Sequence, residues 1–301
     1  MKIALVGATG FLGNEFRDHL QGSGHQLLSF SRSCPDPFEN ESVIEAAVDE
    51  RFPLERLLDQ DLVLYCAGSG VQSGSVVDNT EVYLVNTYFP IKLAEYLAQR
   101  VFTGTLVTFG SYFEIGNNAV SRQFREGEII FASAEVPNAY CISKRLLTKY
   151  VHDSRSKFRH LHFILPTIYG ERENPNRLIP YMVNCLGNRH ALSLTAANQV
   201  RQYLYVRDLV AMVMDLTEQL APGIYNVPSA ITITIRELAT KVAAYFEVSL
   251  NESSFNAVAR ADTAMRDLQM DASALRQSIP DFRFTRLDDV IPRYQYELQK
   301  L

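Results

Sequence analysis

The chain has 301 residues, enough for one large domain or two modest ones. Hydrophobic residues make up 47% of it and charged residues 21%, which fits a soluble globular protein with a sizeable core. The formal net charge is −5 and the basic residues are scattered, so no nucleic-acid-binding surface is expected. An anionic ligand would have to be met by local positive groups rather than by the overall charge.

The sequence predicts neither a secretion signal nor a membrane span. The strand-like segment Ile3–Val6 begins almost at the first residue and is too short for the apolar part of a signal peptide. No apolar run approaches the ~18 residues that a membrane helix needs. Four cysteines are spread along the chain without metal-ligand spacing: Cys34, Cys66, Cys141 and Cys185. We therefore expect reduced thiols, no metal site and a cytoplasmic protein.

Short apolar strands alternate with amphipathic helices through the first half of the chain. After Ile3–Val6, the side chains of Leu12, Phe16 and Leu20 fall on one face of a predicted helix. Further segments follow in chain order: strands Leu27–Phe30 and Leu62–Tyr65, helix Val85–Leu97 with Ile91, Ala94 and Leu97 inward, strand Leu106–Phe109, helix Ala139–Val151 capped by Asn138, and strand Leu161–Leu165. The pattern of residues 33–60 is ambiguous, and we expect a helix in part of it. This alternation predicts an α/β fold with a doubly wound parallel sheet, the Rossmann architecture.

The pattern changes after Gly170. Polar turns lead into a predicted helix Ile179–Leu186, and a helix Leu209–Leu216 and a short strand Gly223–Val227 follow. Thr234 and Glu237 form a capping box that opens a helix through Phe246. We expect a dinucleotide-binding domain over residues 1–166, to which 202–226 return, and a smaller C-terminal α/β substrate-binding lobe over residues 167–201 and 227–301.

Three glycines, Gly7, Gly10 and Gly13, follow the first strand and open the first helix. Gly7 allows a tight turn, Gly10 lets backbone N–H groups approach a pyrophosphate, and Gly13 lets the helix pack close to the strand. The helix N-terminus adds roughly half a positive charge that faces the phosphates. The turn therefore predicts a bound dinucleotide, with a plain glycine turn as the alternative.

The end of the second strand distinguishes the two nicotinamide cofactors. NAD sites usually place a carboxylate there for the ribose 2′-hydroxyl. Here the segment ends in Ser31 and Arg32 and carries no acid. Arg32 can pair with a 2′-phosphate, and Ser31 can donate a hydrogen bond to it. We therefore expect NADP(H), with a solvated loop arginine as the alternative.

Tyr140 and Lys144 lie four residues apart, on one face of a predicted helix. An ammonium group near a phenol favours the phenolate, so we expect Lys144 to lower the pKa of Tyr140 from ~10 toward working pH. Tyr140 could then exchange a proton with a carbonyl or alcohol oxygen. Ser111 follows the strand Leu106–Phe109 and should lie at the carboxyl edge of the sheet, where it could polarise the same oxygen.

With these motifs the chain resembles the extended short-chain dehydrogenases/reductases of the sugar-nucleotide epimerase/dehydratase group. The resemblance covers essentially the whole length and rests on the glycine turn, Tyr65-Cys66-Ala67-Gly68, Asn86, residues 110–116, Tyr140-x-x-x-Lys144 and residues 166–170. It implies that Tyr140 is the catalytic acid/base, Ser111 its partner and Lys144 its activator. It also implies cofactor contacts from Gly7, Thr9, Gly10, Phe11, Leu12, Gly13, Ser31, Arg32, Cys66, Ala67, Gly68, Asn86, Tyr140, Lys144 and Pro166.

The resemblance also narrows the reaction. Family 4,6-dehydratases carry an Asp-Glu pair directly after the catalytic hydroxyl, whereas this chain has Tyr112 and Phe113, so dehydration is not expected. Epimerase/reductases that need an additional cysteine and histidine are not matched either, because Cys141 lies inside the Tyr-Lys motif. Simple carbonyl reduction and 4-epimerisation remain, and Arg32 favours net reduction with NADPH. The sequence looks most similar to the CDP-abequose synthase group of nucleotide-sugar 4-ketoreductases.

The expected substrate is therefore a nucleotide-diphosphate 4-keto-6-deoxy sugar of deoxysugar biosynthesis, reduced at C4. By the resemblance, Arg201 contacts the diphosphate and Arg260 lies where relatives have a second arginine, with exposed structural arginines as the alternative. Ser111, Tyr112 and Thr167 complete the expected substrate contacts. Thr167 and Ile164 depart from the asparagine and arginine of many sugar-nucleotide epimerases. The loop 117–139 is long and polar, and could close over the sugar.

Three other functions stay open at this point. The first is a nucleotide-sugar 4-epimerase that holds NAD, and the second is a reductase of a non-sugar carbonyl. The third is a redox sensor that binds NADP without catalysis, although such relatives generally lose the Tyr-Lys pair. His160 and His162 are interpreted as packing or surface residues rather than metal ligands, and Tyr203 with Tyr205 as filling between the lobes. The helices Val85–Leu97 and Ala139–Val151 could form the four-helix seam of a homodimer, as in such relatives.

Overall fold

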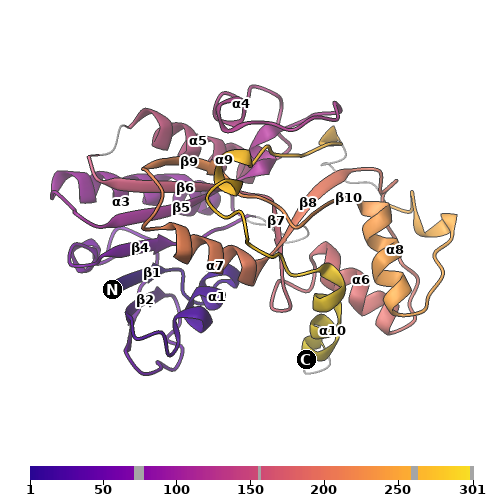
Figure 1. Ribbon diagram of the computed structural model, residues 1–301, viewed down its shortest axis with the longest axis horizontal. Helices are drawn as coiled ribbons and strands as arrows, with labels where there is room; N and C mark the ends of the chain where they lie inside the picture. The colour runs from indigo at the N-terminus through magenta and orange to yellow at the C-terminus, as the bar shows by residue number, and fades with distance from the viewer. Residues whose placement is uncertain (71–77, 155–156, 259–263, 299–301) are drawn as a thin grey trace.

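The fold is built on a seven-stranded parallel sheet, seen in a computed structural model that describes residues 1–70, 78–154, 157–258 and 264–298 (Figure 1). The strand order is β3-β2-β1-β4-β5-β6-β9, and every neighbouring pair is parallel. The strands are β1 (Lys2–Val6), β2 (Gln26–Ser31), β3 (Glu41–Glu45), β4 (Leu62–Tyr65), β5 (Thr105–Ser111), β6 (Arg159–Leu165) and β9 (Gly223–Asn226). The chain reverses its direction of winding between β1 and β4, so the predicted doubly wound Rossmann sheet is confirmed.

Helices cover both faces of this sheet. On one face α1 (Phe11–Leu20) packs beside α7 (Val206–Leu216), which returns from the second half of the chain (Figure 1). Apolar side chains of both helices join Ile3, Leu5 and Val107 of the sheet in one core cluster. On the other face lie α3 (Phe89–Gln99) and α5 (Ala139–Asp153). The predicted helices are therefore confirmed in kind and approximate position, including the Asn138 cap, whose side chain accepts a hydrogen bond from the Cys141 backbone N–H.

Two predictions about the first half were wrong in detail. Residues 33–60 contain the strand β3 and only a single 3₁₀ turn, η1 (Leu54–Leu57), where a helix was expected. The helix predicted from Val85 begins earlier, because α2 (Asn79–Tyr83) and the π-helical turn η2 (Leu84–Tyr88) run directly into α3. Ala94 and Leu97 are buried as predicted, together with Phe89 and Leu93, whereas Ile91 is only half-buried.

A second, three-stranded sheet has the order β10-β8-β7. Its strands are β7 (Thr167–Tyr169), β8 (Val200–Tyr205) and β10 (Ile231–Thr234), and the helices α6 (Leu178–Gly187), α8 (Ile235–Tyr245) and α10 (Leu287–Leu298) pack beside one another at this end of the molecule (Figure 1). The predicted capping box at the start of α8 is present, with Thr234 and Glu237 each accepting from the other's backbone N–H. Shorter helices are η3 (Tyr112–Ile115), α4 (Glu126–Ile130), η4 (Glu252–Ser254) and α9 (Ser273–Arg276).

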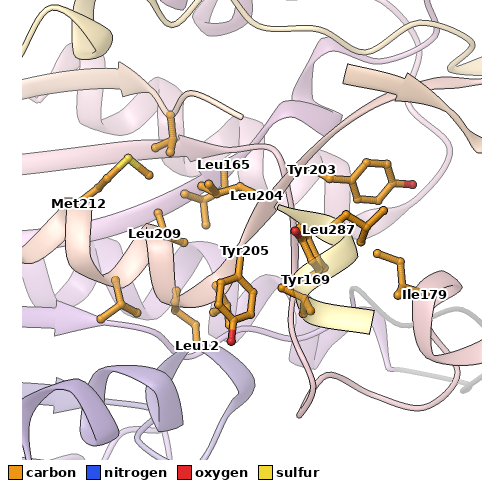
Figure 2. Close-up of a cluster of buried hydrophobic side chains, with 14 of the residues drawn as sticks. Leu12, Leu165, Tyr169, Ile179, Tyr203, Leu204, Tyr205, Leu209, Met212 and Leu287 are labelled. Carbon is orange, nitrogen blue, oxygen red and sulfur yellow. The ribbon is translucent and has the colours of Figure 1, made fainter. Parts of the chain in front are cut away.

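The two sheets share one hydrophobic core. Figure 2 shows Tyr203 and Tyr205 of β8 with Tyr169 of β7, beside Leu204 and Leu287. The Tyr169 ring lies 6.4 Å from that of Tyr203 and 5.8 Å from that of Tyr205, measured between ring centroids. All three rings are buried, which confirms that the tyrosines fill the space between the two parts of the chain.

The structure also tests the predictions about the cysteines, the two strand histidines and a membrane span. No disulfide joins the four cysteines. His160 and His162 are buried and both bond to the Thr108 hydroxyl, at 2.9 and 2.8 Å, so they are packing residues within the core. Within 1–70, 78–154, 157–258 and 264–298, no helix combines the length and the apolar character that crossing a bilayer requires.

Candidate active site

A cleft of about 660 Å³ opens at the carboxyl edge of the large sheet. It follows the ends of β1, β2, β4 and β5, where open α/β sheets bind their ligands. The structure brings most of the sequence-predicted residues to its walls: Gly7, Thr9, Gly10, Phe11, Leu12, Ser31, Arg32, Cys66, Ala67, Gly68, Ser111, Tyr140, Lys144, Pro166 and Thr167.

The glycine turn is shaped by close contacts that a side chain would prevent. A Cβ on Gly7 would lie 2.6 Å from the Ala67 backbone nitrogen, and the Gly7 φ of +88° also favours glycine. A Cβ on Gly13 would lie 2.1 Å from the Gly7 carbonyl oxygen, so Gly13 lets the helix start against the turn. Gly10 caps α1 without a side-chain acceptor, which leaves the first N–H groups of the helix for a ligand. These residues fit the pyrophosphate of a dinucleotide.

Ser31, the last residue of β2, and Arg32, the next residue, also line the cleft. The Arg32 side chain is 82% exposed and forms a 3.8 Å ion pair with Glu81, which also lines the cleft. The Ser31 hydroxyl is turned toward the Ser33 carbonyl oxygen and bonds to it. Arg32 is thus free to move toward an anionic group, because an exposed ion pair of this length stabilises it only weakly.

Ser111, Tyr140 and Lys144 all line the cleft. Ser111 ends β5 and its hydroxyl accepts a hydrogen bond from the Phe113 backbone N–H, which starts the turn η3. Tyr140 and Lys144 project from the first two turns of α5, and Lys144 Nζ donates to the Phe109 carbonyl oxygen at 2.8 Å. That bond ties the helix to β5 beside Ser111, so the three groups share one wall.

The protonation states differ from the sequence prediction. Burial raises the pKa of Tyr140 above its usual range, and the hydrogen bond of Ser111 and the charge of Arg177 offset this only in part. Burial also lowers the pKa of Lys144 to about 8. The predicted net lowering of the Tyr140 pKa was therefore wrong: Lys144 Nζ lies 5.9 Å from the phenol ring centroid and bonds to the backbone, and burial is the largest effect on the phenol.

Several predicted residues lie outside the cleft lining. Asn86 is buried in η2, where its side-chain amide bonds to the Ser69 backbone and to the Ser143 hydroxyl, so it supports the wall from behind. Tyr112 lies behind the wall as well, and its hydroxyl bonds to that of Thr167 at 2.6 Å. Gly13 acts through packing, as described above. Arg260 falls outside the described residues.

Arg201 is buried on β8 rather than exposed. Its Nη1 donates to the Val200 carbonyl oxygen at 2.9 Å, and its Nη2 has no hydrogen-bond partner among the residues that the structure describes. An unsatisfied buried donor of this kind is costly and points to an unmet acceptor. Arg201 is not among the described residues that line the cleft.

Sequence reasoning missed other lining residues. Arg177 reaches the cleft from the start of α6, where its Nη1 pairs with Glu173 at 3.1 Å and its Nη2 donates to the Ile168 carbonyl oxygen at 2.9 Å. Asp49 follows β3, a strand that the sequence did not reveal. The polar turn after Gly170, read only as a change of pattern, was the available signal for Arg177.

A glycine turn at a Rossmann switch point, joined to a serine, tyrosine and lysine in one cleft, defines the class of short-chain dehydrogenases/reductases in its extended form. The chain belongs to the NAD dependent epimerase/dehydratase family, whose model matches residues 3–227. The resemblance seen in the sequence is thereby confirmed, and the protein is an enzyme of this oxidoreductase-related family.

The sequence identity to individual relatives is low. The chain is 24% identical to a CDP-abequose synthase of Salmonella muenchen, over 75% of this chain and 73% of that one. It is 24% identical to a dTDP-6-deoxy-L-talose 4-dehydrogenase (NAD(P)(+)) of Kitasatospora kifunensis, over 79% and 76%. Among solved structures, the Bordetella bronchiseptica enzyme WbmG in complex with NAD superposes with a TM-score of 0.80 at 21% identity, covering 100% of this chain and 94% of that one. This last likeness shows the fold alone.

Proposed function

We propose that this protein reduces the C4 carbonyl of a nucleotide-diphosphate 4-keto-6-deoxy sugar with NADPH. The observation that carries the proposal is the meeting of Ser111, Tyr140 and Lys144 in the cleft that the glycine turn opens. No carboxylate accompanies them at positions 112 and 113, where Tyr112 and Phe113 stand, so the site lacks an acid/base pair for eliminating water at that place.

The protonation of the site also supports reduction. Burial raises the pKa of Tyr140, so its phenol holds a proton at neutral pH and can give it to a developing alkoxide. Lys144, with a pKa of about 8, keeps its positive charge at neutral pH and stabilises the phenolate that remains. An acid that starts protonated suits a reduction, whereas oxidation of an alcohol needs a base.

The proposed reaction is a hydride and proton transfer. Reduced nicotinamide, when bound, supplies the hydride that C4 receives. Tyr140 Oη gives its proton to the carbonyl oxygen, which becomes a hydroxyl. The Ser111 hydroxyl donates a hydrogen bond to the same oxygen, and Lys144 balances the charge left on Tyr140. Bulk solvent then returns a proton to Tyr140.

Arg32 supports NADPH as the cofactor. Its side chain lies just after β2, is 82% exposed and has only a 3.8 Å ion pair with Glu81, so it can reorient toward a 2′-phosphate. Glu81 beside it is the observation that favours a second candidate function, a 4-epimerase that holds NAD, because a carboxylate at this end could accept from a ribose 2′-hydroxyl. The two candidates differ in whether NADPH is consumed.

The substrate class is supported by Arg201 and by the relatives. The Nη2 of Arg201, which has no partner in the described part of the chain, is a suitable donor for a diphosphate oxygen after a small movement of the second sheet. Thr167 lines the cleft beside Ser111, and Tyr112 holds the Thr167 hydroxyl, so we keep both as substrate-side residues, with Arg260 as a second arginine. The named activities of the curated relatives concern a CDP-linked and a dTDP-linked deoxysugar.

We further propose that residues 1–166 and 202–226 bind the cofactor and that residues 167–201 and 227–301 bind the substrate, a boundary that β8 crosses. β9 joins the large sheet, and β8, which spans Val200–Tyr205, pairs in the small one. The cleft lies between them, since Thr167, Asn174 and Arg177 line it together with the glycine turn. We also propose a homodimer through η2 and α5, where Tyr88, Ile142 and Leu146 are exposed.

The proposal is tested by following NADPH oxidation with CDP-, dTDP-, GDP- and UDP-linked 4-keto-6-deoxy sugars. We expect turnover with at least one of them, and we expect Tyr140→Phe to lower kcat by about a thousandfold because it removes the general acid. The NADPH affinity of this variant, measured by fluorescence, should stay within about threefold of wild type.

Two results would contradict the proposal. Purified protein that carries tightly held NAD and interconverts C4 epimers without consuming NADPH would establish the epimerase instead. Undiminished turnover of Tyr140→Phe would remove the mechanism.

A further inference from the structure

A fully buried carboxyl group, that of Glu114, lies directly behind the catalytic wall. Its Oε1 accepts a hydrogen bond from the Ser111 backbone N–H at 2.7 Å, and it completes a capping box in which Ser111 is the N-cap of η3. Its Oε2 is buried and has no hydrogen-bond partner in the described part of the chain. The residue is 0% exposed, so an ionised carboxylate here needs nearby positive charge.

The groups around Glu114 come from α5 and β6. On α5, the positive charges of Lys144 and Arg145 and a hydrogen bond from the Thr148 hydroxyl lower the pKa of Glu114. The Thr148 hydroxyl is also hydrogen-bonded to Nε2 of His162, at 2.9 Å. On β6, burial lowers the pKa values of His160 and His162, so both are neutral. Lys144 and Arg145 are therefore the cations that balance a Glu114 carboxylate.

The carboxyl group is fixed in place by close packing. A Cβ added to Gly110, the residue before Ser111, would lie 2.7 Å from Glu114 Oε1 and 2.7 Å from His162 Nε2. The absence of a side chain at Gly110 is what lets the carboxyl group approach the strand. Arg145 anchors the backbone of the same residue, since its Nε donates to the Glu114 main-chain carbonyl oxygen at 2.6 Å.

We propose that Glu114 is a positioning residue that holds the Ser111 backbone in place and, through its negative charge, keeps the proton on Lys144. The inference rests on the proposed roles of Ser111, Tyr140 and Lys144. Glu114 does not line the cleft, so it acts through its neighbours and touches neither cofactor nor substrate. Its charge also favours the protonated form of Tyr140, which is the form that a reduction uses.

The directions of the pKa shifts agree with this arrangement. Burial raises the pKa of Glu114 to about 7, so its carboxyl group is mostly ionised above neutral pH. Burial lowers the pKa of Lys144 to about 8, and the Glu114 charge is the largest effect that opposes this. Burial also raises the pKa of Cys66, so this neighbouring thiol carries no charge at neutral pH. Without Glu114, the pKa values of Lys144 and Tyr140 would both move down.

The test compares Glu114→Gln with Glu237→Gln. Both carboxylates occupy the third position of a capping box, but Glu237 is at the start of α8, away from the cleft. Glutamine keeps an acceptor for the Ser111 N–H and removes the charge. Lysine labelled with ¹³C at Cε reports the Lys144 pKa by NMR, with the resonance assigned from its loss in Lys144→Met. We expect Glu114→Gln to lower this pKa by about one unit and Glu237→Gln to leave it unchanged.

The pH profile of kcat/KM gives a second readout on the active enzyme. Its alkaline limb should move to lower pH in Glu114→Gln by a similar amount, because Lys144 and Tyr140 lose their protons earlier. Unchanged Lys144 titration in Glu114→Gln would overturn the inference. The NMR readout needs no substrate, so failure to find a reducible sugar would count against the proposed function and not against Glu114.

A second variant protects the test against misfolding of Glu114→Gln. Thr148→Val removes the hydroxyl that favours the ionised carboxylate, while Glu114 and its bond to Ser111 remain. Glu114 would then be charged in a smaller fraction of molecules near neutral pH, and the Lys144 pKa should fall in the same direction by less. A Lys144 pKa that stays at the wild-type value in a folded Thr148→Val protein would contradict the charge effect.

Discussion

At the scale of single residues, burial decides the chemistry as much as residue type does. The sequence placed Ser111, Tyr140 and Lys144 in one site, but the sign of the Tyr140 pKa shift depends on how much water the fold removes. The same holds for Glu114, which reads as an ordinary polar residue in a turn until the fold buries it against β5. A single sequence shows how residues are spaced along the chain, but it does not show how far the fold removes water from their side chains.

Arg32 carries the prediction about cofactor choice. Arg32→Ala should raise the KM for NADPH about tenfold, since one charge-assisted contact to a 2′-phosphate is lost, and should leave the KM for NADH unchanged. Steady-state kinetics with both cofactors measure this. Arg56→Ala, which removes an exposed arginine on η1, is the matched control. Equal changes in KM for NADPH and NADH would show that Arg32 does not bind the 2′-phosphate.

At the scale of elements, sequence periodicity predicted the strands that are buried on both faces. It missed the elements that are only partly buried or that depend on tertiary hydrogen bonds. Strands buried on both faces, such as β1 and β4, stand out as short apolar runs. The edge strand β3 is only half-buried, so its residues Glu41–Glu45 gave no clear pattern. The π-helical turn η2 escaped because it depends on the tertiary bonds of Asn86 to Ser69 and Ser143.

The helix α10 shows how a late element can support the cleft. The Tyr294 hydroxyl accepts from the Gly170 backbone N–H at 2.8 Å and donates to Glu173, and Glu173 pairs with Arg177 of the cleft wall. Tyr294→Phe leaves the Gly170 N–H and the Glu173 carboxyl without this partner, in a buried place. We expect it to lower the free energy of unfolding by about 1–3 kcal/mol.

Denaturant unfolding of Tyr294→Phe checks this expectation, together with an increase in the substrate KM as Arg177 loses its support. The control is Tyr245→Phe, which removes an exposed hydroxyl that also bonds to α10, through Gln295. That change should stay within about 0.5 kcal/mol of wild type. Equal stability of the two variants would show that the buried bond contributes little.

At the scale of the whole molecule, two sheets share one core and border one cleft. The Rossmann sheet could be predicted because each motif carries its own local signal. The positions of Arg177 and Arg201 could not, because they depend on how β8 and α6 pack across the junction. The structure therefore brings the named residues of the first sheet to the cleft, whereas Arg177 was not named from the sequence and Arg201 was named only by resemblance.

The proposed homodimer is a prediction at this scale. A mass of twice 34.0 kDa is expected by light scattering, and Leu146→Glu should shift it toward one copy, because a charge in the apolar seam would be buried. Val120→Glu changes an exposed apolar residue elsewhere and should leave the mass unchanged. A wild-type protein that stays monomeric across the micromolar range would contradict the seam.

The central claim is the reduction of a sugar at C4, and an isotope label tests it most directly. NADPH carrying deuterium at nicotinamide C4 would be incubated with the enzyme and the 4-keto-6-deoxy sugar nucleotide that the oxidation screen selects, and the product examined by NMR. We predict one deuterium at sugar C4, one NADPH consumed per product, and loss of the signal with Tyr140→Phe. A product without deuterium at C4, or formed without consumption of NADPH, would contradict the account.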